Sequence, residues 1–135
     1  MNNNKMVTGF LISAGLIGLY VGGSLLFFPA QLQADNGIIL SNASYFSEAR
    51  APGAAIFSAT ILSLISLFRV HWRRTALIIM ALFFLSYGLG RLLSLALDGM
   101  PSQGLFYAMI GELIMGVFAI IMLVKMKVAN KKVNN

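Results

Sequence analysis

Long apolar runs dominate the pattern of hydrophobic and polar positions along the chain. Four of them stand out, at about 6–28, 51–68, 75–97 and 104–124. A hydrocarbon core about 30 Å thick needs ~20 helical residues, and each run fits that length. In lipid, only a helix or a closed barrel satisfies its own backbone, and barrel strands would be shorter and would alternate in polarity. The pattern therefore predicts an all-α fold, a four-helix transmembrane bundle forming a single domain over residues 1–135.

The first connection is long, running from about 29 to 50, and it begins at Pro29. The triplet Asp35-Asn36-Gly37 is a turn signal, because these residue types tolerate the backbone angles of tight turns. Residues 38–47 mix apolar and polar side chains, and the sequence leaves open whether they form a short helix or a strand at the interface.

Two further features predict how the helices pack. The segment 98–103, Asp-Gly-Met-Pro-Ser-Gln, is a tight turn, so the third and fourth helices are expected to be antiparallel neighbours. In the first helix, Gly18 and Gly22 are spaced four apart, a pattern that lets helix backbones approach closely in lipid. We expect this motif to report tight packing, either within the bundle or between protomers.

Composition agrees with a membrane environment. Of the 135 residues, 59% are hydrophobic and 10% are charged, whereas soluble domains carry about 25% charged residues. A chain of this length cannot hide such a surplus in its own core. There is no cysteine, which excludes disulfides and thiolate metal ligands. The first apolar run is longer than that of a signal peptide and lacks a clear cleavage site, so we expect it to be retained.

The basic residues are distributed unevenly. Most lie before the first helix, between the second and third helices or after the fourth helix: Lys5, Arg69, Arg73, Arg74, Lys125, Lys127, Lys131 and Lys132. The positive-inside rule places this side, and both termini, in the cytoplasm. The net charge of +6 is then explained by attraction to anionic lipid headgroups at the cytoplasmic face, and nucleic acid is not an expected partner.

Two charged residues fall inside the spanning segments. Arg91 lies seven residues before Asp98, and Glu112 lies eight residues after Gly104. A helical rise of ~1.5 Å per residue puts them about 10 and 12 Å from the turn between their helices. Charges at membrane depth persist only when they are paired or solvated. We therefore predict that Arg91 and Glu112 meet in the half of the bundle opposite the basic face.

The neighbours of this pair form continuous helix faces. On the third helix, a polar stripe follows helical spacing and must point into the bundle or into a water-filled crevice: Tyr87, Arg91, Ser94 and Asp98. On the fourth helix, the Glu112 carboxylate shares a face with three small residues: Gly104, Ala108 and Gly116. Such residues allow close helix approach, which would bring the two charges into contact.

The entrance to the second helix adds two charges. Pro52 suits the first turn of a helix, where its missing N–H is no loss. Glu48 and Arg50 would then lie at the outer membrane boundary, near the mouth of the same crevice, with Tyr45 or Tyr107 as further wall residues. The candidate ligand-binding residues are therefore Arg50, Arg91, Glu48, Glu112, Tyr87 and Asp98.

These residues support several roles. An Arg–Glu pair can simply fix helix register, or it can mark a functional site. The leading hypothesis is a non-enzymatic bundle that binds a small molecule or lipid headgroup in an outward-facing polar crevice, or an accessory subunit with a second copy or another membrane protein as partner. The alternative is a membrane enzyme acting on a lipid-soluble substrate, with Glu112 or Glu48 as the acid–base group. Transport would require an oligomer. No catalytic residue is assigned.

No cofactor and no metal site is expected from the sequence. His71 is the single histidine, and with no cysteine and no second histidine in the chain a metal site is not expected. No phosphate-binding loop, dinucleotide fingerprint or Ser/His/Asp set occurs.

The sequence resembles a bacterial family of four-helix membrane proteins known as domain of unknown function 4345. The resemblance is carried by Glu48-Ala-Arg50 with Gly53, by Gly90-Arg91-Leu-Leu-Ser94 with Asp98-Gly-x-Pro101, by Glu112, and less specifically by the segment from Gly18 to Pro29. It departs at 50–55, where an Arg-Gly-x-x-Gly-Gly-like pattern is replaced by Arg-Ala-Pro-Gly-Ala-Ala. The resemblance implies a four-helix membrane fold in the bacterial cytoplasmic membrane and no particular activity.

Overall fold

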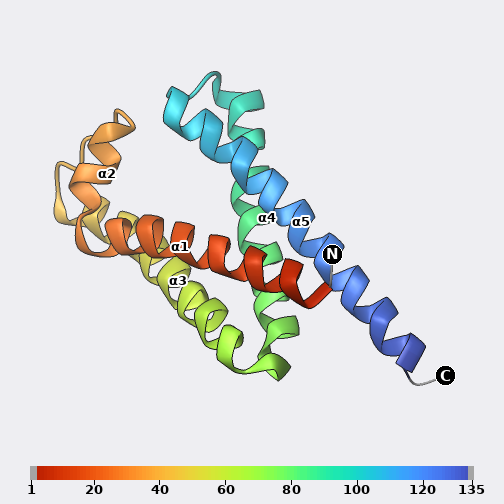
Figure 1. The fold of residues 1–135 in the computed structure, drawn as a ribbon. Helices are drawn as coiled ribbons and strands as arrows, with labels where there is room; N and C mark the ends of the chain where they lie inside the picture. The colour runs from red at the N-terminus through yellow and green to blue at the C-terminus, as the bar shows by residue number, and fades with distance from the viewer. Residues whose placement is uncertain (1–2, 134–135) are drawn as a thin grey trace.

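The computed structural model describes the backbone of residues 3–133 and the side chains of residues 4–126. The elements in order are α1 (Asn3–Phe27), α2 (Pro29–Asp35), α3 (Ala43–Phe68), the 3-10 turn η1 (Val70–Trp72), α4 (Arg73–Asp98) and α5 (Gln103–Val133). Four of these helices, α1, α3, α4 and α5, are long and apolar enough to span a membrane (Figure 1). The all-α, four-span prediction is confirmed. The side chains of Lys127, Lys131 and Lys132 lie outside the described residues.

The second spanning helix begins earlier than the apolar run predicted. It starts at Ala43, not near residue 51, and Asn42 caps it by accepting a hydrogen bond from the Tyr45 backbone N–H at 3.1 Å. Pro52 therefore lies inside the helix, and its predicted place in the first turn is wrong. Pro52 lacks an N–H, so the Glu48 carbonyl loses one helical partner, yet the capped turns before it still continue the helix. Hydropathy found the apolar part of the helix and missed its polar start.

The first connection contains one short helix. Pro29 opens α2, where its fixed backbone angle suits the first helical position. The predicted turn at Asp35-Asn36-Gly37 is confirmed, and Gly37 has φ +78°, a left-handed angle that glycine adopts without strain. Of the segment left open by the sequence, residues 38–41 have no regular structure and residues from 43 onward belong to α3.

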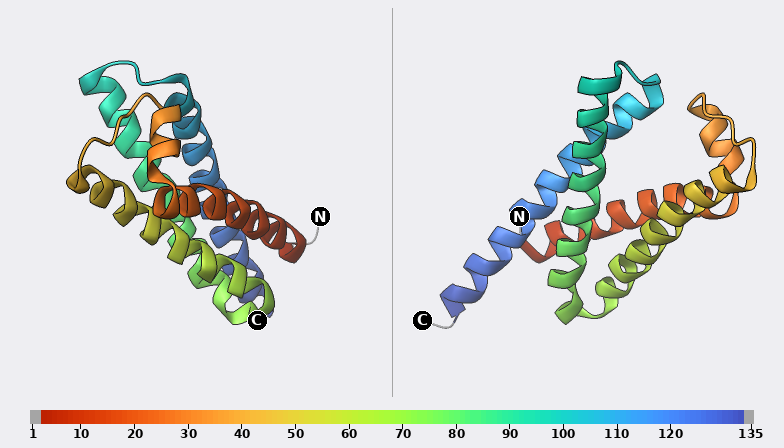
Figure 2. Two further views of the ribbon diagram at one scale, coloured as in Figure 1. Left: turned by 90° about the vertical axis from the view of Figure 1, so that its left-hand side faces the viewer. Right: turned by 180° about the vertical axis from the view of Figure 1, so that it is seen from behind.

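The spanning helices form two pairs. Helix α1 packs along α3, and α4 packs along α5, with fewer contacts between the pairs. Figures 1 and 2 show the pairs crossing at an angle, with α3 joined to α4 by a short turn. Near the start of α1 a buried cluster joins α1, α4 and α5: Val7, Leu11, Ala76, Leu77 and Met122. The tight turn and antiparallel packing predicted for the last two helices are confirmed.

The α1–α3 interface explains the glycine spacing in α1. A methyl group added at Gly22 would lie 2.7 Å from the backbone nitrogen of Phe57, and one added at Gly18 would overlap the hydroxyl of Thr60. Ser63 also donates a hydrogen bond across the interface to the Leu11 carbonyl at 3.2 Å. The motif therefore packs within the bundle, because only residues without side chains allow this approach.

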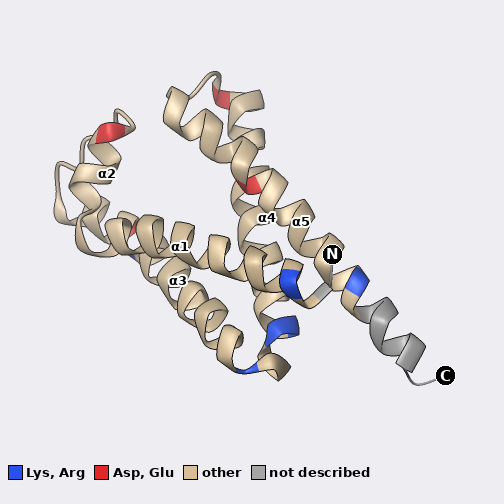
Figure 3. Ribbon diagram, viewed as in Figure 1, with Lys and Arg blue, Asp and Glu red and all other residues tan. Residues whose placement is uncertain are grey.

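Charge is segregated along the bundle. Figure 3 shows most basic residues gathered at the end where α1 begins and α3 meets α4, while acidic residues lie toward the opposite end. Arg50 and Arg91 lie away from the α3–α4 junction, near the start of α3 and the end of α4. We call these the basic end and the opposite end. The separation follows the distribution read from the sequence, and the cytoplasmic location of the basic end stays a prediction.

Candidate functional site

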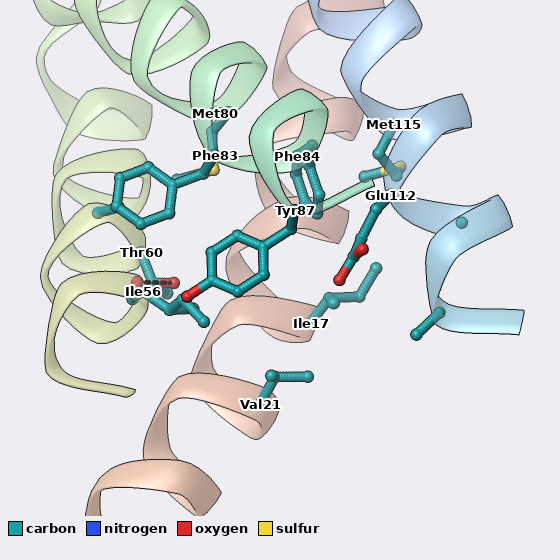
Figure 4. Close-up of a pocket in the computed structure, with 13 residues that line it drawn as sticks. Ile17, Val21, Ile56, Thr60, Met80, Phe83, Phe84, Tyr87, Glu112 and Met115 are labelled. Carbon is teal, nitrogen blue, oxygen red and sulfur yellow. Dashed lines mark hydrogen bonds between the residues drawn. The ribbon is translucent and has the colours of Figure 1, made fainter. Parts of the chain in front are cut away.

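A cavity lies where the two helix pairs cross, and every spanning helix contributes to its wall (Figure 4). Its volume is about 210 Å³. We call it the central cavity. Most of its lining is apolar, and three residues bring polar groups to it: Thr60 from α3, Tyr87 from α4 and Glu112 from α5. The other lining residues are Ile17, Val21, Ile56, Ala59, Met80, Phe83, Phe84, Ala108, Gly111 and Met115.

Arg91 and Glu112 meet beside this cavity. The Nε–H of Arg91 donates to both carboxylate oxygens of Glu112, at 3.0 Å to Oε2 and 3.3 Å to Oε1. The Arg91 side chain is 30% exposed and that of Glu112 is 17% exposed. The structure thus brings together the two charges whose depths along neighbouring helices agreed. Their role in ligand binding stays a prediction.

Two glycines bring the helices close enough for this contact. Gly88 lies one turn before Arg91, and a methyl group added there would lie 2.8 Å from Cδ2 of Leu113 on α5. Gly116 lies one turn after Glu112, and a methyl group there would lie 2.5 Å from Cδ2 of Leu85 on α4. The absent side chains let the two backbones approach, so the charged side chains reach each other directly.

Most of the Arg91 guanidinium remains open. Only its Nε–H donates a hydrogen bond; within the described side chains, neither terminal nitrogen has an acceptor. Beside it lies a groove of about 350 Å³ lined by Ser86, Tyr87, Gly90 and Arg91. We call this the Arg91 groove. Gly90 leaves it open, because a methyl group built there meets nothing within 4 Å.

Tyr87 lies in the wall of both hollows. Its ring stacks on Phe83, with centroids 6.4 Å apart and planes 17° apart. Figure 4 shows its hydroxyl pointing toward Thr60 and Ile56 on α3. The Thr60 hydroxyl instead donates to its own helix, at the Ile56 carbonyl, 2.9 Å away. Among the described residues, the Tyr87 hydroxyl has no hydrogen-bond partner, so it presents an open donor at the cavity wall.

Arg50 and Glu48 do not join this pair. Arg50 donates from Nε to the Leu26 carbonyl at 3.3 Å, and its guanidinium lies 5.5 Å from the ring centroid of Phe46. It therefore satisfies a carbonyl in the last turn of α1, a favourable place for a cation. Glu48 is exposed on α3 and lines neither the central cavity nor the Arg91 groove. The predicted convergence of four charges is wrong, because the early start of α3 directs its polar turns toward α1.

The remaining candidates also lie apart from the cavity. Asp98 is exposed at the end of α4 and accepts a hydrogen bond from Ser94 at 2.8 Å. Tyr45 and Tyr107 are 53% and 68% exposed and are absent from the lining. Sequence reasoning missed the apolar lining altogether, including Phe83, because an apolar residue facing a cavity has the same sequence signature as one facing lipid.

Metal binding has no support in the part of the chain that the structure describes. There, no three His, Asp or Glu side chains lie close enough together to hold an ion.

The fold and its charge pair define the class: a membrane-embedded four-helix protein with a central apolar cavity and an intramembrane Arg–Glu pair. The chain belongs to the family described as Domain of unknown function (DUF4345), whose model matches residues 6–123. This confirms the resemblance carried by the motifs around Arg91, Asp98 and Glu112. No curated protein and no solved structure matches the chain.

Proposed function

We propose that this protein binds a lipid-soluble small molecule in the central cavity. The observation that carries the proposal is the Tyr87 hydroxyl, which has no partner among the described residues and lies at an apolar hollow that all four spanning helices line. A polar group at membrane depth is costly unless it finds a partner. A ligand with an acceptor atom would satisfy the hydroxyl, while its apolar part would contact the Phe and Met side chains of the lining.

The size of the cavity restricts the ligand. A volume of about 210 Å³ corresponds to about seven waters at ~30 Å³ each. Pockets for drug-sized ligands are larger, at about 300–1,000 Å³. The cavity therefore suits a single ring or a short stretch of chain, and the rest of a longer molecule would lie among the membrane lipids.

Catalysis is the second candidate, because the Glu112 carboxylate lies in the cavity wall. Its carboxylate oxygens already accept from the Arg91 Nε–H, which suits orientation of a ligand better than proton transfer. Glu48 lies outside the cavity and is not a candidate for this role. An activity on a lipid-soluble substrate that Glu112→Gln abolishes, while ligand binding persists, would favour the enzyme.

Photo-crosslinking in lipid nanodiscs tests the binding proposal. The probe is a long-chain alcohol that carries a diazirine, and mass spectrometry locates the labelled residues. We expect saturable labelling of cavity residues such as Met80 and Met115, competed by excess unmodified alcohol. Gly111→Leu should abolish it, because Gly111 lines the cavity and a side chain there fills space without a clash.

Gly9→Leu is the matched control. Gly9 also has nothing within 4 Å of an added methyl group, and it lies away from the central cavity on α1. It should label like the parent protein. Labelling that never saturates, or that spreads over lipid-facing residues such as Leu82 and Leu93, which are 61% and 60% exposed, would show that the cavity takes no ligand.

A further inference from the structure

Several hydrogen-bond donors beside the central cavity are open. Among the described residues, neither the two terminal nitrogens of Arg91 nor the Tyr87 hydroxyl has a hydrogen-bond partner. In water such groups would be hydrated, whereas at membrane depth each unmet donor carries a desolvation cost. The Glu112 carboxylate accepts from the Arg91 Nε–H but receives no hydrogen bond from these donors, so acceptor atoms on a ligand would satisfy them.

The charges at the site are already balanced. The linings of the central cavity and the Arg91 groove contain one guanidinium, Arg91, and one carboxylate, Glu112, and these form an ion pair. An anionic ligand head would leave a net negative charge at membrane depth, where an uncompensated charge is costly. Further along α4 the next ionisable group is Asp98, which would repel an anion as well.

From these two observations we infer that the ligand has an uncharged, carbonyl-type head, such as a ketone, ester or quinone carbonyl. The head occupies the Arg91 groove and accepts hydrogen bonds from the terminal nitrogens of Arg91. The apolar part lies in the central cavity. This inference rests on the proposed function and names the chemical class of its ligand.

Tyr87 is the residue that the two parts of the site share. Its ring belongs to the walls of both the groove and the cavity. A ligand that occupies both would therefore contact Tyr87, whose ring stacks on Phe83. The guanidinium contributes a planar set of donors, and its bonds to a carbonyl oxygen are charge-assisted and hence stronger than neutral ones.

Three diazirine probes of equal chain length test the inference: a methyl ketone, a carboxylic acid kept ionised by mildly alkaline buffer, and a headless alkane. Labelling of the cavity is measured in nanodiscs against each probe's concentration in the bilayer. We expect the ketone to half-saturate at about a tenfold lower concentration than the alkane, as charge-assisted hydrogen bonds imply. The acid should bind no better than the ketone.

Two variants separate the contribution of the ligand's polar head to binding from that of its apolar part. Gly90→Leu places a side chain at the Arg91 groove, which Gly90 lines, and Gly90 is absent from the lining of the central cavity. It should remove the advantage of the ketone and leave alkane labelling unchanged. Arg91→Lys keeps a cation for Glu112 but loses the planar donors, so it should reduce the same advantage. Gly111→Leu should lower labelling by every probe.

The outcomes distinguish the two proposals. Saturable labelling with equal ketone and alkane affinities would overturn the carbonyl inference and leave the proposed function standing. Tighter binding of the acid than of the ketone would also overturn it, because the head would then be anionic. Ketone preference that persists in Gly90→Leu would place the head outside the groove. Loss of saturable labelling by all three probes in the parent protein would overturn the proposed function itself.

Discussion

The two helix pairs achieve close packing by different means. In α1–α3, glycines bring backbone against backbone: Gly22 faces Phe57, and Gly53 faces Leu25 and Leu26. One serine hydroxyl adds a hydrogen bond across the interface, from Ser63 to the Leu11 carbonyl. In α4–α5, glycines again permit the approach, but the interface also contains the ion pair of Arg91 with Glu112.

This difference bears on why the ion pair exists. Lipid provides no hydrophobic driving force between helices, so they associate through close packing and hydrogen bonds. Helices α1 and α3 achieve that with small residues, and the ion pair found among the described side chains belongs to α4–α5. Close packing in this chain therefore does not require a charge pair. The pair also lies beside both hollows, which favours a role in ligand binding.

The largest effect is expected where glycine separates two backbones. Gly22→Ala would place a methyl group 2.7 Å from the Phe57 backbone nitrogen, which cannot move without shifting α3. We expect a loss of about 1–3 kcal/mol in the free energy of unfolding, as for other overpacked interfaces. Denaturant titration in detergent micelles, followed by circular dichroism, measures it.

The neighbouring Gly23→Ala is the control for this substitution. Its added methyl group would meet ring atoms of Phe57 at 3.9 and 4.0 Å, which is ordinary contact. Both variants replace glycine by the better helix former in the same turn, so intrinsic propensity cancels. Equal stabilities for the two variants would contradict the backbone contact and with it the account of the α1–α3 pair.

A smaller effect is expected when the ion pair of α4–α5 is replaced as a unit. The double variant Arg91→Gln with Glu112→Gln keeps hydrogen-bonding side chains and removes both charges. Because Gly88 and Gly116 still hold the helices together, we expect a change in unfolding free energy below ~1 kcal/mol. The single variant Arg91→Gln should cost more, since it leaves the Glu112 carboxylate without its cation.

The same denaturant titrations on the two single variants and the double variant complete a double-mutant cycle. A double variant that loses as much stability as Gly22→Ala would show that the ion pair stabilises α4–α5 as the glycines stabilise α1–α3. The contrast between the pairs would then disappear, and the charge pair would be structural.

The smallest effect on the protein is expected from single-cysteine substitutions in the segments that connect the helices. Their labelling reports the side of the membrane on which each connection lies. The chain has no cysteine of its own, and three exposed connecting positions are available: Ser41 between α1 and α3, Met100 between α4 and α5, and His71 between the pairs. A membrane-impermeant maleimide applied to intact cells should label Ser41→Cys and Met100→Cys. His71→Cys should react only after permeabilisation, as the positive-inside rule predicts.

Each result has a distinct consequence. Labelling of His71→Cys alone would reverse the predicted orientation and keep the four spans. Labelling of Ser41→Cys and Met100→Cys from opposite sides would place the α1–α3 and α4–α5 connections on opposite sides of the membrane. That result would contradict four complete spans.

The sequence by itself determined the features that depend on position along a helix axis. Spanning segments follow from apolar length, because bilayer thickness and helical rise are fixed. The turn at Asp35-Asn36-Gly37 and the turn between α4 and α5 lie where the turn residues predicted them, although the short helix α2 was not predicted. Counting from the turn placed Arg91 and Glu112 at similar depths on neighbouring helices, and that was sufficient to predict their contact.

Only the tertiary structure decided the features that depend on rotation about the axes and on neighbours distant in the chain. Arg50 faces the end of α1 instead of Arg91 because α3 begins at Ala43 and its polar turns pack against α1. The apolar lining of the central cavity left no trace in the sequence, although its polar residues Tyr87 and Glu112 did. Lipid chains are as apolar as the Phe, Met and Ile side chains of its lining, so hydropathy cannot distinguish a helix face that borders a cavity from one that borders the membrane.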